Sequence, residues 1–199
     1  MPLTASVLRY VFVESTPGLK STVLELPEVC KTGNGIKAKQ SPDVQARVAF
    51  TELPGRGTAC MRSPRRLHSP QARVAFTELD ATKPDWPVKE ADFELVLMSY
   101  ISGSVPEAII GKLYENAFKA LKPGGRLLVH DFMVNDSLDG PALGSLWALQ
   151  HVTVNAGGLG LTPAEVISRM TAVGFAKCET MEMINGLTKL IVACKNSDK

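Results

Sequence analysis

Several side chains able to do chemistry stand directly after short segments rich in apolar and β-branched residues. They are Glu25, Asp80, Ser99 with Tyr100, and His130 with Asp131. Open α/β sheets bind ligands at the carboxyl ends of their strands, so we expect these side chains along one edge of a sheet. One carboxylate there can accept hydrogen bonds from both hydroxyls of a ribose, and another can accept from an adenine amino group. Together the strand-end residues favour a nucleoside site.

Some polar residues of the chain also have an ordinary structural explanation. His130 follows a segment typical of a buried strand, where a histidine is as often structural as functional. Tyr100 either packs in the core or, as is common at a strand end, has its hydroxyl in a cleft. Trp147, His151 and Asn155 recur every four residues and so share one face of a predicted helix. The last two could simply be polar residues near a helix end.

The elements that position these residues alternate between the two kinds of secondary structure. Strands are predicted at 21–26, 74–79, 93–98 and 126–130, and helices at 106–121, 143–154 and 163–173. The chain closes with a hairpin, 179–184 and 188–194, around an Asn-Gly turn. This order predicts an α/β sheet that is parallel except at one edge, where the hairpin lies.

Two helix ends carry explicit signals. Thr162 is the predicted N-cap of the helix at 163–173, with Pro163 at its first position and Glu165 placed for a capping box. The Lys-Pro-Gly-Gly segment at 122–125 predicts a stop after the helix that Pro106 opens.

One nonapeptide occurs twice, as Gln45–Leu53 and again as Gln71–Leu79. Only the second copy leads into a predicted strand and its strand-end acid. The segment between the copies, at about 54–70, holds four arginines and no acid. It is either a nucleic-acid arm or a solvated insertion loop, and the loop is favoured because the segment has no aromatic residue on which a base could stack. We therefore expect one domain over 1–199 with a basic insertion loop.

Composition narrows the class of protein. The chain has 199 residues, of which 45% are hydrophobic and 21% charged, with a net charge of +2. That charge gives no reason to expect a nucleic-acid partner. The four cysteines form no C-x-x-C pair, no apolar run reaches the roughly 18 residues of a membrane span, and the first residues do not resemble a secretory signal. A cytoplasmic, membrane-free protein without a metal site is expected.

Four segments of the chain resemble those of S-adenosylmethionine-dependent small-molecule O-methyltransferases of class I. They are Val23–Val29, Leu79–Ala81, Ala117–Val129 and Asn155–Glu165. The resemblance covers roughly residues 8 to 195, apart from the insert. It implies a Rossmann-like sheet, S-adenosylmethionine as cofactor, a small-molecule methyl acceptor and, in the full-length family, a homodimer.

The resemblance also implies roles for individual residues. The cofactor would be held by Glu25 and Leu26 at the ribose, Asp80 and Ala81 at the adenine, and Ser99 and Tyr100 beside the methionine portion. The acceptor pocket would be lined by Tyr100, Asp131, Trp147, His151 and Asn155. Asp131 would either balance the sulfonium charge or only cap the following turn.

The chain departs from the family pattern before its first predicted strand. The family has a glycine-rich turn some twenty residues before the ribose acid, and counting back from Glu25 reaches Met1 without one. We therefore expect an amino-terminally truncated fold whose sheet lacks the first, central strand. Two sheet fragments would then each expose unpaired backbone groups. The alternative function is a catalytically inactive fragment that only binds a full-length homologue.

A second departure concerns the catalytic base. O-methylating members carry a histidine just after the fourth strand, and that place falls at Gly103 here. A hydroxyl acceptor gains much from a positioned base, whereas a thioether sulfur needs none. This slightly favours a sulfur acceptor, as in the branch that methylates methylthiohydroxybutyrate on the route to dimethylsulfoniopropionate. If the acceptor is a hydroxyl, His130 or His151 would supply a relocated base.

Overall fold

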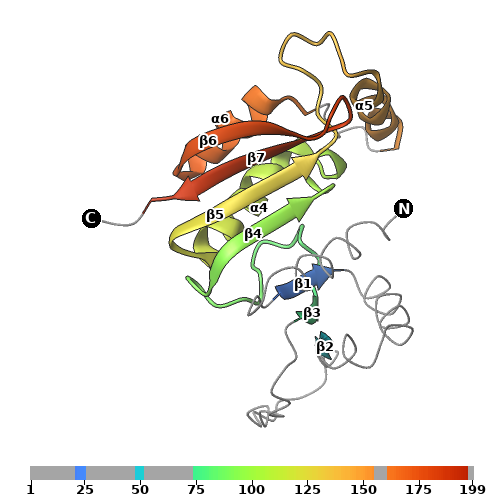
Figure 1. Cartoon of the computed structure of the whole chain (residues 1–199). Coiled ribbons are helices and arrows are strands. Elements are labelled where there is room, and N and C mark those ends of the chain that lie inside the picture. Colours follow the sequence, from blue (N-terminus) through green and yellow to red (C-terminus); the bar gives the residue numbers. More distant parts are fainter. Residues whose placement is uncertain (1–20, 26–47, 52–73, 155–160, 197–199) are drawn as a thin grey trace, which may run out of the picture. The chain divides into compact units, whose positions relative to one another are not determined.

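The chain folds into two compact units, Met1–Ala81 and Thr82–Lys199. The computed structural model describes residues 21–25, 48–51, 74–154 and 161–196, and its side chains are described over 79–150 and 161–196. The predicted loop at 54–70, together with Leu26 and Asn155, lies outside the described residues. Figure 1 labels the strands β1, β2 and β3 of the first unit and β4 to β7 of the second.

The first unit contains a parallel three-stranded sheet in the order β1-β3-β2. Its strands are β1 (Ser21–Glu25), β2 (Val48–Thr51) and β3 (Val74–Glu78). The strands β1 and β3 agree with the predicted ones, but β2 was not expected. It comes from the first copy of the nonapeptide, and its residues pair in register with the same residues of the second copy, from Val48 with Val74 to Thr51 with Thr77. Both copies therefore form strands, because they share one β-prone sequence.

The second unit contains a mixed four-stranded sheet in the order β4-β5-β7-β6. Its strands are β4 (Phe93–Ser99), β5 (Leu121–Asp131), β6 (Phe175–Ile184) and β7 (Thr188–Lys195). β4 and β5 are parallel, while β7 runs antiparallel to both of its neighbours. This confirms the α/β prediction with its antiparallel terminal hairpin.

Two helices cover one face of the second sheet. They are α4 (Glu107–Ala120) and α6 (Pro163–Val173), which pack against each other behind the strands (Figure 1). The core between helices and sheet consists of fully buried apolar side chains, among them Ile110, Leu113, Leu127, Val129, Val166, Met170 and Ile191. β4 borders this sheet, and Leu95 near its start is 51% exposed. The core therefore holds the carboxyl ends of β4 and β5 against a rigid helical layer.

Both helix ends that carry explicit sequence signals agree with the structure, but the strand after α4 begins earlier than predicted. Thr162 and Glu165 form the predicted capping box, and Gly174 closes α6 in the left-handed conformation, with a φ of 112°. The predicted stop at the Lys-Pro-Gly-Gly segment also agrees, since α4 ends at Ala120 with Leu121 as its C-cap. The strand that follows was expected from residue 126, whereas β5 already begins at Leu121. The segment forms an irregularity within β5, where Gly124 has a φ of 77° and the register with β4 shifts.

The remaining elements lie at the carboxyl ends of β4 and β5. A short 3-10 helix, η1 (Ser102–Ser104), follows β4, and α5 (Ala142–Val154) follows the loop after β5. α5 contacts η1, so both border the same end of the sheet. None of the helices in the described part of the chain has the length and apolar character of a membrane span.

Candidate functional site

The first unit brings two of the predicted acids to one sheet edge. Glu25 is the last residue of β1 and lies opposite Glu78 in the parallel register with β3. Asp80 follows Glu78 by two residues, after the buried Leu79. Because parallel strands end at the same edge, Glu25 and Asp80 lie at the same edge of this sheet. Asp80 and Ala81 both make interactions with other residues. Their roles at a cofactor stay predictions.

The second unit gathers four aromatic rings at the carboxyl ends of its parallel strands. Tyr100 lies beside the His130 ring at 4.8 Å between centroids and beside the Phe132 ring at 5.2 Å. Phe132 in turn lies 4.5 Å from Trp147 of α5, with their planes inclined by only 32°. Three of the predicted residues, Tyr100, His130 and Trp147, are thus brought together. We call Tyr100, His130, Phe132 and Trp147 the aromatic cluster.

The backbone at Tyr100 is unusual for a residue with a bulky side chain. Its φ is 58°, in the left-handed region, and its N–H donates to the carbonyl of His130 at 2.9 Å. Such a conformation costs about 1–3 kcal/mol and persists only where neighbouring contacts hold it. Burial and the nearby Asp131 raise the pKa of the Tyr100 hydroxyl, so it remains protonated at neutral pH. The chain therefore turns sharply at the strand end and directs the Tyr100 ring against His130 and Phe132.

His130 has hydrogen-bond partners on both ring nitrogens. Its Nδ1 lies 3.2 Å from the hydroxyl of Ser99, and its Nε2 lies 3.0 Å from the hydroxyl of Thr188. Burial lowers the pKa of His130, so the neutral ring, with one donor and one acceptor nitrogen, is the favoured form. The ring ties β4, β5 and β7 together. Its predicted role as a base would require one of these hydroxyl contacts to open.

Asp131 is the most deeply buried acid of this region, with 1% of its surface exposed. Its carboxylate accepts hydrogen bonds from the backbone N–H of Gly103 at 3.3 Å and of Phe132 at 2.9 Å. Burial raises the pKa of Asp131 to about 7, and the backbone hydrogen bonds partly offset this. The carboxyl group therefore links η1 to the end of β5, which is the local structural role that the sequence left open.

Gly103 stands where a side chain would have room. A Cβ atom built on it would lie 3.5 Å from Cδ1 of Leu161 and 3.9 Å from Oδ1 of Asp131, both ordinary contacts. Next to it, the buried Tyr114 donates to the Ser102 hydroxyl at 3.1 Å. η1 is thus fixed from two sides, by Asp131 and by Tyr114. Position 103, where the sequence has no imidazole, therefore has room for a Cβ atom.

Three residues that shape this region were not predicted from the sequence. Phe132 joins Tyr100 to Trp147, Thr188 holds Nε2 of His130, and Tyr114 holds η1. Phe132 directly follows the predicted pair His130 and Asp131, so its position was a usable signal. Thr188 is 58 residues from His130 in the sequence, and only the antiparallel register of β5 with β7 brings them together. For His151, the structure describes the backbone in α5 but not the side chain.

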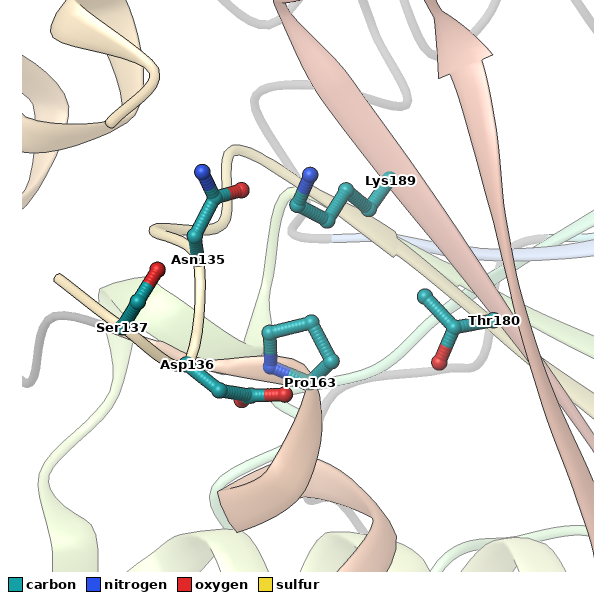
Figure 2. Close-up of a pocket in the computed structure, with 6 residues that line it drawn as sticks. All are labelled: Asn135, Asp136, Ser137, Pro163, Thr180 and Lys189. Carbon is teal, nitrogen blue, oxygen red and sulfur yellow. The ribbon is translucent and has the colours of Figure 1, made fainter. Parts of the chain in front are cut away.

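A hollow of about 460 Å³ lies beside this region and contains none of the predicted site residues. Figure 2 shows its lining, which comes from the loop after β5, the start of α6 and the hairpin: Asn135, Asp136, Ser137, Pro163, Thr180 and Lys189. Lys189 is paired with Glu182, and Asp136 accepts from the backbone N–H of Ala164 at 2.8 Å. The charged groups of the hollow therefore serve the fold.

Parts of the chain are similar in sequence to two methyl transferases. No protein-family model matches the chain. A segment of 96 residues, 47% of the chain, is 31% identical to the tetracenomycin polyketide synthesis 8-O-methyl transferase TcmO of Streptomyces glaucescens. A segment of 119 residues, 59% of the chain, is 27% identical to the S-adenosyl-L-methionine-dependent methyl transferase PigF of a Serratia species. These matches cover 27% and 33% of the two relatives, respectively.

Solved structures share the fold. The structure of PigF with SAH matches 96% of this chain and 47% of its own, with a TM-score of 0.69 and 19% identity. Human N-acetylserotonin methyltransferase in complex with SAM matches the same share of this chain and 45% of its own, with a TM-score of 0.67 and 20% identity. The chain thus spans about half the length of these proteins. Over that half, it has the fold of the class I S-adenosylmethionine-dependent methyltransferases.

Proposed function

We propose that this chain binds S-adenosylmethionine and serves methyl transfer to a small-molecule acceptor. The observation that carries the proposal is the match to two named methyl transferases, one of them S-adenosyl-L-methionine-dependent, together with the shared class I fold. The strand-end residues agree with it, because they supply carboxylates in one unit and an aromatic cluster in the other. No observation favours the alternative of an inactive fragment.

The first unit would hold the nucleoside part of the cofactor. Glu25 and Asp80 lie at one edge of adjacent parallel strands, a placement that suits two hydrogen-bond acceptors for a ribose diol and an adenine amino group. Leu26 and Ala81 directly follow these acids in the sequence and would border the same groups. When bound, S-adenosylmethionine supplies a methyl group activated by a positively charged sulfur. The acids would fix its orientation.

Residues of the second unit are the ones that we propose, from the family resemblance, for the methionine portion of the cofactor and for the acceptor. Ser99 and Tyr100 follow each other at the end of β4, and the face of an aromatic ring such as that of Tyr100 attracts a nearby cation. Asp131 would act mainly by holding η1 in place, since both of its oxygens accept backbone hydrogen bonds. Tyr100, Asp131, Trp147, His151 and Asn155 remain the proposed acceptor-side residues. The apolar ring faces would exclude water from the reacting atoms.

The acceptor atom is proposed to be a thioether sulfur, as in a methylthiohydroxybutyrate-like compound, ahead of a hydroxyl. A sulfur lone pair attacks without losing a proton, so the transfer depends on positioning. Among the described side chains of the region, the two titratable candidates for a base are engaged: His130 with two hydroxyls and Asp131 with two backbone N–H groups. His151 remains the candidate base if the acceptor is a hydroxyl.

A methyl-transfer assay with labelled S-adenosylmethionine tests this proposal. The full chain is incubated with a panel of small thioethers and a matched panel of phenols, and labelled products are separated. We expect transfer to thioethers to exceed transfer to phenols and to survive His151→Ala. Transfer only to phenols, abolished by His151→Ala, would contradict the sulfur acceptor while leaving the methyltransferase. Absence of both transfer and cofactor binding would reject the function itself.

A further inference from the structure

The helix α5 comes very close to the segment after β5 at one glycine. A Cβ atom built on Gly144, in the first turn of α5, would lie 2.9 Å from the carbonyl oxygen of Met133 and 3.2 Å from its carbonyl carbon. Ordinary van der Waals contacts of a Cβ atom begin at 3.4 Å. This approach of the helix to the strand-end segment therefore requires a residue without a Cβ atom.

The Met133 backbone is held from both sides. Its side chain is fully buried. The N–H of Phe132 donates to Oδ1 of Asp131 at 2.9 Å, and the N–H of Val134 donates to the carbonyl of Leu161 at 2.9 Å. A side chain on the facing glycine would therefore displace α5 and leave this segment in place. An ordinary contact at 3.4 Å instead of 2.9 Å requires a movement of about 0.5 Å.

Such a movement reaches the aromatic cluster. Gly144 and Trp147 are three residues apart and so lie on the same face of α5. The Trp147 ring lies 4.5 Å from the ring of Phe132, the residue directly before Met133. The helix face that rests on the Met133 backbone is therefore also the face that places Trp147 beside Phe132.

We propose that Gly144 is a positioning residue, which sets the place of Trp147 on the acceptor side of the site. The inference rests on the proposed function, in which Trp147 lines the acceptor pocket. Glycine in a helix is less stable than alanine, and the close approach to Met133 is a reason for a glycine at this position. A Cβ atom there would move the Trp147 ring away from Phe132. Contacts with the acceptor would change, whereas the strand-end residues proposed for the cofactor would stay in place.

Tryptophan fluorescence tests the position of the ring without cofactor or acceptor. The chain has two tryptophans, Trp86 and Trp147, so a Trp86→Phe background reports on Trp147 alone. In that background Gly144→Ala should shift the emission to longer wavelength and increase its quenching by acrylamide, because the ring leaves its contact with Phe132. Gly111→Ala is the matched control in α4, since no described atom lies within 4 Å of a Cβ atom built there. Its emission should be unchanged.

Kinetics of the same substitutions, with both tryptophans present, test the role at the acceptor. Methylthiohydroxybutyrate and, in parallel, phenol serve as acceptors with labelled S-adenosylmethionine. For the acceptor that is methylated, Gly144→Ala should raise the KM about tenfold and change kcat little, because a wall of the pocket has moved. The Kd of S-adenosylmethionine, measured by calorimetry, should stay the same. Gly111→Ala should change none of these values.

Several results would overturn the proposal. Unchanged Trp147 emission in a folded Gly144→Ala variant would show that the glycine does not set the ring position. Changed emission with an unchanged acceptor KM, or with an equally weakened cofactor, would reject the role at the acceptor. If Gly144→Ala does not fold by circular dichroism, Trp147→Leu must raise the same KM, and an unchanged KM would count against the proposal. An unmodified chain without any transfer would reject the proposed function, and the emission of Trp147 would still decide whether Gly144 positions the ring.

Discussion

The two sheets end their parallel strands in different ways. In the first unit, the register sets Glu25 opposite Glu78, and Asp80 follows two residues later, so the edge carries three acids within a short distance along two strands. In the second unit, the corresponding ends carry Ser99 opposite His130, and each polar group there has an internal partner. One edge concentrates charge of a single sign, and the other is internally satisfied.

This difference suggests that the two edges contribute differently to the stability of the fold and to the binding of a ligand. Like charges opposite each other on neighbouring strands destabilise a sheet, so the acidic edge opposes folding of the first unit. Carboxylates at the carboxyl ends of parallel strands are also well placed to accept hydrogen bonds from a ligand. At the second edge, hydrogen bonds within the protein hold the His130 ring and the Tyr100 backbone, and ring contacts join them to Phe132 and Trp147. Substitutions at the acidic edge should therefore change the affinity for a ligand. Substitutions at the second edge should mainly change the free energy of unfolding.

The largest effect on stability is expected at Asp131. Between pH 4 and 7 the folded protein keeps the proton on this buried carboxyl, because burial raises its pKa to about 7, whereas the unfolded chain has released it. The folded state then binds more protons than the unfolded state, so the contribution of Asp131 to stability falls as the pH rises through this range. Asp131→Asn should remove up to about 4 kcal/mol of this pH dependence.

Urea unfolding of both proteins at pH 4.5 and pH 7.5 checks this prediction. Asp139→Asn is a suitable control, since hydrogen bonds from Ser137 and Asn135 lower the pKa of that exposed acid and its effect on stability has the opposite sign. The difference in unfolding free energy between the unmodified chain and Asp131→Asn should change with pH. The same difference at both pH values would contradict the raised pKa of Asp131.

A smaller effect is expected for the aromatic cluster. Phe132→Leu keeps an apolar side chain but removes the ring contacts with Tyr100 and Trp147, and should cost about 1–2 kcal/mol of stability. It should also raise the KM of the acceptor. Phe118→Leu, which breaks the edge-to-face contact with Phe175, is the matched control. Thermal unfolding should show similar losses of stability for the two variants. Acceptor kinetics should show a raised KM for Phe132→Leu alone.

The hydrogen bond between the Thr188 hydroxyl and Nε2 of His130 should contribute slightly less to stability than the ring contacts of Phe132. Thr188→Val keeps the side-chain shape but leaves a buried ring nitrogen without its partner, which should cost about 1 kcal/mol. Thr171→Val removes an exposed hydroxyl that bonds to the Ile167 carbonyl of its own helix and to the Cys178 thiol, and should cost less because the site is open to water. Chemical denaturation of the two variants compares them directly, and equal values would show that the contact at His130 adds nothing.

The smallest stability change, of opposite sign, is expected at the acidic edge. Glu25→Gln removes one of the two charges that oppose each other between β1 and β3, so it should stabilise the protein by about 0.2–1 kcal/mol. A substitution that stabilises the fold yet weakens a ligand is the signature of a binding residue. A loss of stability measured by denaturation for Glu25→Gln would show that the acid serves the fold instead.

Local patterns predicted the elements whose causes are local. The capping box of Thr162 and Glu165 marked the start of α6, and the Asn-Gly turn marked the hairpin, where Leu187 donates to Ile184 across the turn. The Lys-Pro-Gly-Gly segment correctly marked the end of α4, but the strand after it begins at Leu121 and not at 126. The early start depends on pairing of Leu121 with Phe93 of β4, and that pairing is not local.

The candidate site shows the same limit. Strand-end positions of Tyr100 and His130 followed from the predicted strands, and α5 supplied Trp147. The partners that fix these groups, Thr188 and the backbone N–H of Gly103, come from segments whose approach depends on sheet register and on η1. The first nonapeptide copy became β2 for a similar reason, because an identical strand was available beside it.

The proposed function depends on binding of S-adenosylmethionine at the acidic edge of the first unit. Isothermal titration calorimetry of the cofactor into the unmodified chain, Glu25→Gln and the exposed-acid control Glu115→Gln tests it most directly. We expect binding by the unmodified chain, an unchanged Kd for Glu115→Gln, and a Kd about tenfold weaker for Glu25→Gln, close to the value of one charge-assisted hydrogen bond. Equal affinity of the unmodified chain and Glu25→Gln would contradict the claim.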